Sequence, residues 1–148
     1  MKKNSVVVDA GISRLVAAMN IHGFRTYASC QGHGFPVDRI KPYVAFTSRQ
    51  SDAARLARLL REDAESPVPL LRWGWEVTAS FNGIYRLCFR LHPTGPHYWW
   101  VRYCRRSLTE DFSSIVQMVK SANGEPAGRI DYPGMPQSTN NQYGDYSS

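Results

Sequence analysis

Residues 71–91 read LRWGWEVTASFNGIYRLCFRL, two strand-like runs joined by an Asn-Gly pair. Asn82 and Gly83 both tolerate positive φ, which makes this pair a strong short-range signal for a β-hairpin. We therefore predict two antiparallel strands, at residues 71–80 and 85–91.

Two helices and two further strands are predicted on the N-terminal side of this hairpin. Residues 9–20 carry apolar side chains with the i, i+3, i+4, i+7 spacing of an amphipathic helix, and Gly23 is placed to end it. A second helix is predicted over residues 51–64, where leucines form one side and arginines the other. Residues 24–30 and 43–46 have the composition of short strands, which we expect to pair with each other.

The C-terminal side of the hairpin is less regular. Residues 93–96 contain two prolines and a glycine and interrupt the strand pattern, and residues 97–103 fit either an edge strand or the lead-in to a helix. Ser107 and Glu110 have the Ser-x-x-Glu spacing of a capping box, which predicts a third helix that ends near residue 123.

Together these elements predict an α+β fold, in which two or three helices pack on a mainly antiparallel sheet of four or five strands in the order α-β-β-α-β-β-(β)-α. The chain of 148 residues has room for one hydrophobic core. We assign that single domain to residues 1–124. Residues 125–148 are polar, with few aliphatic side chains to bury, and are expected to form a disordered tail.

Charge and cysteine content narrow the class of protein. Lysine and arginine exceed aspartate and glutamate by six, and arginine supplies most of the excess. Because the guanidinium fork suits phosphate and carboxylate, an anionic partner is expected, with a merely solubilising surface as the alternative.

Three cysteines, an odd number, and no apolar leader argue against a secreted disulfide scaffold. No apolar stretch approaches the ~20 residues that cross a bilayer, so we expect a soluble, cytoplasmic protein that does not enter a membrane.

The segment Ser29-Cys30-Gln31-Gly32-His33-Gly34 follows a predicted strand and is the loop best suited to carry chemistry. Its two glycines permit close approach of a ligand to the backbone. Cys30 and His33 are three residues apart, so a thiol and an imidazole can meet across a tight turn.

Four interpretations of this loop remain open. Loop amides, Ser29 and His33 can bind an anion. His33 can activate Cys30 as a nucleophile, although no orienting carboxylate or amide is identifiable. Both can bind zinc, but the further ligands, from His22, Cys88, His92, His97 or Cys104, show no paired spacing. The segment can also be a purely structural turn. We favour anion binding, which requires least of the remaining sequence, and therefore predict no metal and no cofactor; Cys30 and His33 are catalytic candidates only if the chain is an enzyme.

Arginines and aromatic residues elsewhere suit a nucleotide ligand. Arg86 and Arg90 are expected on one face of a strand, and Arg105 and Arg106 precede a helix N-terminus, which favours anions. Interleaved aromatic rings can stack on a base, although such rings also fill cores. The predicted ligand-binding set is Ser29, Cys30, Gly32, His33, Phe81, Asn82, Arg86, Arg90, Arg105 and Arg106.

Residues 15–46 resemble small uncharacterised proteins of phages and their bacterial hosts that share a helix, a Ser-Cys-x-Gly-His loop and a Pro-Tyr/Phe-Val-x-Phe strand. The matching residues are Asn20, Gly23, Thr26, Ser29, Cys30, Gly32, His33, Gly34, Pro42, Tyr43, Val44 and Phe46. The size and the aromatic and arginine content are also similar to those of the sponges with which phages sequester cyclic nucleotide or cyclic ADP-ribose signals, including the first Thoeris anti-defence family. The resemblance implies a counter-defence role in the cytoplasm of a host cell.

Three functions follow from these observations. The first is a non-enzymatic binding protein, expected to be a homo-oligomer, that sequesters a small phosphorylated (cyclic) nucleotide or ADP-ribose-like signal. The second is an anti-CRISPR-like inhibitor that binds a host defence protein through electrostatic complementarity. The third is a Cys/His-dependent enzyme that acts on a nucleotide-like substrate.

Overall fold

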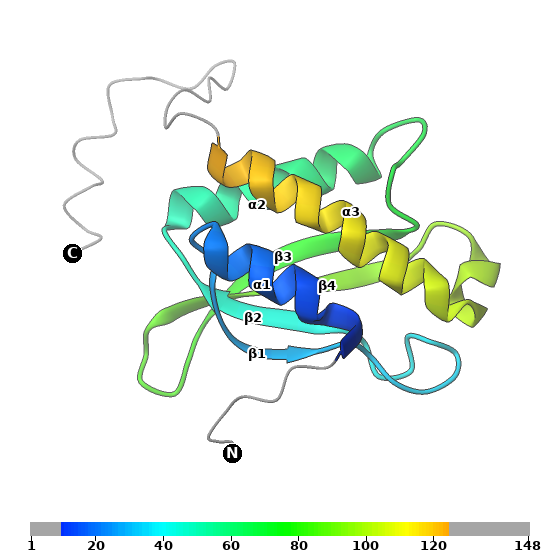
Figure 1. Cartoon of the computed structure of the whole chain (residues 1–148), viewed down its shortest axis with the longest axis horizontal. Coiled ribbons are helices and arrows are strands. Elements are labelled where there is room, and N and C mark those ends of the chain that lie inside the picture. Colours follow the sequence, from blue (N-terminus) through cyan, green and yellow to red (C-terminus); the bar gives the residue numbers. More distant parts are fainter. Residues whose placement is uncertain (1–9, 125–148) are drawn as a thin grey trace.

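The structure is a computed structural model that describes residues 10–124 (Figure 1). The predicted tail, residues 125–148, lies outside the described residues. The elements are a 3-10 turn η1 (Ala10–Ile12), α1 (Ser13–Ile21), β1 (Arg25–Cys30), β2 (Tyr43–Thr47), α2 (Gln50–Ala64), β3 (Trp73–Phe81), β4 (Leu87–Pro96), a 3-10 turn η2 (Trp99–Tyr103) and α3 (Arg105–Gly124).

The four strands form one antiparallel sheet in the order β1-β2-β4-β3. The predicted α+β class and the order α-β-β-α-β-β-α are therefore confirmed. Residues 97–103, for which a strand and a helix lead-in were both open, include the turn η2, which leads into α3. Within residues 10–124 none of the helices has the length and apolar character needed to cross a bilayer.

The first helix ends as its sequence predicts. Gly23 has φ +91°, a conformation that costs glycine little. The Phe24 N–H then donates to the Met19 carbonyl at 2.8 Å, as in a Schellman motif, which turns the chain from α1 into β1.

Two predictions about β4 and α3 are wrong. Residues 93–96 do not interrupt a strand, because β4 continues through them to Pro96. β2 pairs with β4 only as far as Leu91, so the missing N–H groups of these prolines cost no hydrogen bond to β2. The capping box also fails, because α3 begins at Arg105 and Ser107 lies inside its first turn. There the Ser107 hydroxyl accepts the indole N–H of Trp73 at 2.9 Å and donates to the Cys104 carbonyl at 2.7 Å.

The β3–β4 hairpin is confirmed, but its turn does not use the Asn-Gly pair as predicted. The residue with positive φ is Tyr85, at 63°, and not Gly83. The Asn82 side-chain oxygen instead accepts the N–H groups of Ile84 and Arg86, both at 3.0 Å. Asn82 therefore shapes the turn through hydrogen bonds of its side chain. The prediction had relied instead on the ability of Asn and Gly to adopt positive φ.

All three α-helices lie against one face of the sheet (Figure 1). The core between these layers contains Phe24, Phe46, Leu56, Leu91 and Ile115, each fully buried. Because side chains alternate along a strand, the residues between these positions face the other side of the sheet, where no described helix covers them.

The carboxylate of Asp111 connects α3 to β3. It accepts the backbone N–H groups of Arg72 at 2.8 Å and Trp73 at 3.0 Å, together with the indole N–H of Trp75 at 2.9 Å. Its residue is only 1% exposed. Burial raises the pKa of Asp111 to about 6, against the opposing effect of these three donors.

This pKa predicts that Asp111 makes the protein less stable as the pH rises. The folded state binds the Asp111 proton more tightly than the unfolded chain, whose ordinary value is 3.8. The contribution is therefore complete below pH 4 and is lost as the pH rises through about 6. We expect the difference in free energy of unfolding between the wild type and Asp111→Asn to fall by up to about 3 kcal/mol between pH 4 and 7. Urea unfolding of both proteins at the two pH values measures it, and a pH-independent difference would contradict the assignment.

Candidate functional site

The predicted Cys-His loop, Ser29 to Gly34, begins in the last two residues of β1 and continues into a hairpin-like connection, residues 31–42, between β1 and β2. Gly32 and Gly34 have φ of +88° and +92°, and a side chain on Gly32 would come within 3.1 Å of the Ile40 carbonyl oxygen. His33 and Ile40 exchange backbone hydrogen bonds of 2.9 and 3.0 Å. The glycines therefore serve the shape of the loop, since only residues without a Cβ adopt these angles without strain.

The side chains of Ser29 and Cys30 lie on opposite faces of the sheet. Ser29 pairs with Val44, which faces the helices, whereas Cys30 pairs with Tyr43 on the other face. The Cys30 Sγ accepts the Gly32 N–H at 3.4 Å. The two residues thus cannot both line one site with the loop, and the Cys30 sulfur already contacts the loop's own backbone.

Arginines of η2 and α3 hold this loop in place. The Arg105 guanidinium donates to the carbonyl oxygens of Gly32 at 3.2 Å and Gly34 at 3.1 Å. Arg102 forms an ion pair with Asp38 at 3.2 Å, and its carbonyl accepts the Val37 N–H at 2.8 Å. Arg105, predicted to bind a ligand, therefore contacts the loop that was predicted to share that ligand.

The remaining predicted residues do not meet there. Phe81, Asn82 and Arg86 lie at the β3–β4 turn, whereas Cys30 ends β1 at the opposite end of the antiparallel sheet (Figure 1). Cys30 pairs with Tyr43, next to the Val44–Leu91 pair of β2 and β4, so it lies about five residues along β4 from the turn, or about 16 Å at ~3.3 Å per residue. Arg90 lies between them, within the strand, and Arg106 is exposed on the first turn of α3. Within one chain, the predicted set therefore divides into separate places and does not form one site.

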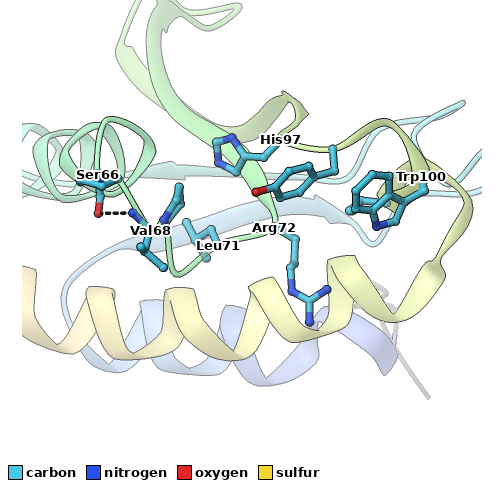
Figure 2. Close-up of a pocket in the computed structure, with 10 residues that line it drawn as sticks. Ser66, Val68, Leu71, Arg72, His97 and Trp100 are labelled. Atoms are coloured by element: carbon cyan, nitrogen blue, oxygen red, sulfur yellow. Dashed lines mark hydrogen bonds between the residues drawn. The ribbon is translucent and has the colours of Figure 1, made fainter.

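A pocket that sequence reasoning missed opens beside η2 (Figure 2). Its volume is about 640 Å³, and its walls come from residues 66–72, which connect α2 to β3, and from residues 97–101. Its polar and aromatic groups are Ser66, Arg72, His97, Tyr98 and Trp100. The two walls are about thirty residues apart in sequence, so no local pattern indicated that they would meet, although the aromatic run 97–103 was conspicuous.

Aromatic rings form one wall of this pocket and continue beyond it. Tyr98 and Trp100 stack with ring centroids 4.9 Å apart and an interplanar angle of 16°. Trp99 packs edge-on against both Trp100 and Tyr103, and Tyr103 contacts Phe35 of the loop. These five rings, which we call the aromatic patch, are each at least 49% exposed. Exposed aromatic area of this extent is typical of a binding surface.

Arg72 provides the cation closest to these rings along the pocket wall. Its Nη2 lies 3.0 Å from Glu110 Oε1 on α3, and both side chains are about half exposed. An exposed pair of this kind contributes little to stability. The Arg72 guanidinium can therefore exchange Glu110 for another anion at small cost.

Among residues 10–124, no three His, Cys, Asp or Glu side chains come together where they could hold a metal ion.

No protein-family model, curated protein or solved structure matches the chain.

The contacts of Arg105 predict that it orders the loop. Arg105→Ala removes both hydrogen bonds to the Gly32 and Gly34 carbonyls, so the His33–Ile40 bridge should open more often. We expect faster amide hydrogen exchange at His33 and Ile40, with exchange in α2 unchanged. Arg106→Ala removes the same charge from an exposed neighbour and is the matched control. Equal protection of the loop in both variants would show that Arg105 does not hold it.

Proposed function

We propose that the chain is a non-enzymatic binding protein for a small phosphorylated nucleotide or ADP-ribose-like ligand, which it sequesters in the pocket beside η2. The observation that carries this proposal is the combination, in one pocket of about 640 Å³, of stacked aromatic rings with the side chains of Arg72 and His97. This volume falls within the range of pockets that enclose small ligands.

The chemistry of the pocket walls suits the two parts of a nucleotide. Tyr98 and Trp100 offer ring faces on which a base can stack. Arg72 supplies the planar guanidinium that binds phosphate in a bidentate manner, and its carboxylate partner Glu110 is exchangeable. A base on the aromatic wall and a phosphate at Arg72 would therefore use both features at once.

Sequestration without turnover fits the pocket better than catalysis does. Its titratable side chains are Arg72, His97 and Tyr98, a set with no nucleophile paired to a general base. Cys30, the candidate nucleophile if the chain were an enzyme, lies outside this pocket at the end of β1, where its sulfur accepts the Gly32 N–H. A counter-defence sponge, as the resemblance implies, requires only binding. We retain a homo-oligomer as part of this proposal.

A second function is favoured by the part of the aromatic patch that lies outside the pocket. Phe35, Trp99 and Tyr103 are exposed and form a continuous surface with the arginine-rich start of α3. Aromatic residues and arginine are enriched in protein–protein interfaces. An inhibitor that binds a host defence protein, including an anti-CRISPR-like one, would use this surface and leave the pocket empty.

The nucleotide proposal predicts a thermal shift that depends on Trp100. Cyclic di- and trinucleotides and ADP-ribose derivatives are screened, since a ligand at 100 times its Kd adds about 2.7 kcal/mol of apparent stability. Trp100→Ala should abolish the shift because it removes the stacking wall. The bound compound should be recovered unchanged after heat denaturation.

Tyr103→Ala is the matched control, because Tyr103 belongs to the aromatic patch but does not line the pocket. It should preserve the thermal shift. If no compound shifts the wild type, while a host protein is captured by the wild type and lost with Tyr103→Ala, the inhibitor replaces the sponge. Recovery of a converted product would instead favour the enzyme.

A further inference from the structure

The face of the sheet that points away from the helices carries an arginine stacked on a tyrosine. Arg90 lies on the central strand β4, and its guanidinium carbon is 4.3 Å from the centroid of the Tyr43 ring on β2. A guanidinium stacked in this way keeps its N–H donors around its edge, where they point past the ring. In the described part of the chain no carboxylate forms an ion pair with Arg90, so these donors are available to a phosphate.

An exposed ring, that of Tyr27, lies beside this pair, in which the Tyr43 ring is half-buried. Tyr27 stands at the β-bulge of β1 between Thr26 and Ala28, and it is 46% exposed. The hydrogen bond with the Cys88 thiol is the largest cause that raises the pKa of the Tyr27 hydroxyl, and burial raises this pKa further. The charge of Arg90 lowers the pKa and Tyr43 raises it, both to a smaller extent. Tyr27 therefore remains neutral and does not repel an anion.

The residues between these rings are small or polar. Ala28 pairs with Ala45, and Ala45 pairs with Arg90, so a shallow floor of alanine separates the ring-bearing positions. On the far side of Arg90 stands Thr78, whose hydroxyl hydrogen-bonds His92 at 3.3 Å. No described helix covers this face, which presents the rings of Tyr27 and Tyr43 beside the Arg90 guanidinium.

The charges of this face favour an anion. Strand alternation and pairing place Arg25 and Arg90 on it, together with one carboxylate, Glu76. Glu76 Oε2 lies 3.5 Å from His92 Nε2 on the edge strand β3, so β4 separates Glu76 from Tyr43 on β2. Arg90 contacts the Tyr43 ring directly, whereas the carboxylate of Glu76 is paired with His92.

We propose that this open face binds single-stranded nucleic acid, independently of the pocket beside η2. One base stacks on Tyr27 and the next on the guanidinium plane of Arg90, which the Tyr43 ring supports from below, and the N–H edge of Arg90 contacts a phosphate of the same strand. Stacking of this kind tolerates any base, because each base has a π-face. A duplex, whose bases already stack on one another, gains nothing from these rings.

The test uses the full chain and a fluorescein-labelled oligothymidylate of about 16 nucleotides, at the upper end of site sizes for small single-strand-binding folds. Fluorescence anisotropy is expected to show binding that weakens with salt. Tyr43→Ala should weaken it about fivefold or more, whereas Tyr43→Phe keeps the ring and should match the wild type. Arg90→Ala should lower the slope of log K against log salt by about 0.7, the loss of one single-strand phosphate contact.

Control variants separate this face from the other surfaces. Arg14→Ala removes one exposed charge from the helical side of the molecule and should change neither the affinity nor the slope as Arg90→Ala does. Trp100→Ala, which disables the pocket, should leave oligonucleotide binding intact, so failure of the pocket proposal does not affect this one.

Three results would overturn the proposal. One is the absence of binding at about 100 µM protein, the weak end of non-specific affinities. Another is equal affinity for a duplex, which would indicate charge alone. The third is loss of binding in Trp100→Ala with no effect of Tyr43→Ala or Arg90→Ala, which would move the binding to the aromatic patch.

Discussion

The three hydrogen bonds accepted by the Asp111 carboxylate fix α3 on the sheet, and the loop and the pocket both depend on that position. Two of the donors are backbone N–H groups at the start of β3, and the third is the indole N–H of Trp75. Losing a buried acceptor would leave all of them unsatisfied. From the same helix, Arg105 reaches the loop carbonyls, and Glu110 pairs with Arg72 at the pocket. A shift of α3 would therefore disturb both places together.

Local patterns in the sequence predicted the features that local interactions determine. The β3–β4 hairpin and the glycine stop after α1 depend on neighbours within a few residues, and both are present. The capping role of Ser107 failed because the helix begins two residues earlier, and the Ser107 hydroxyl accepts the indole N–H of Trp73, thirty-four residues earlier in the chain. Pro93 and Pro96 were expected to break the strand. The strand tolerates them because β2 stops pairing with β4 at Leu91, and the sequence of β4 alone does not show where β2 stops.

The candidate site was predictable in its residue types and not in its location. Residues 97–103 were expected only to form an edge strand or the lead-in to a helix, and the other wall of the pocket comes from residues 66–72, to which no local pattern gave a role. Arg105 was predicted to bind a ligand together with the loop, whereas in the structure the loop's own carbonyl oxygens take up its donors. Spacing along the chain shows that an arginine and a loop are both present, whereas only the fold shows which groups already bind each other.

The two proposed binding surfaces differ in what an incoming phosphate must displace. At the pocket, Arg72 already pairs with Glu110, so a phosphate exchanges one anion for another and gains mainly through bidentate geometry. On the open face, Arg90 lies over the Tyr43 ring with its edge donors uncovered, so a phosphate there adds a contact without breaking an ion pair. Under the nucleotide proposal the pocket requires a ligand whose base also stacks, which would select small nucleotides. The proposed single-strand site would accept any flexible chain of alternating bases and phosphates, because each unit repeats the same pair of contacts.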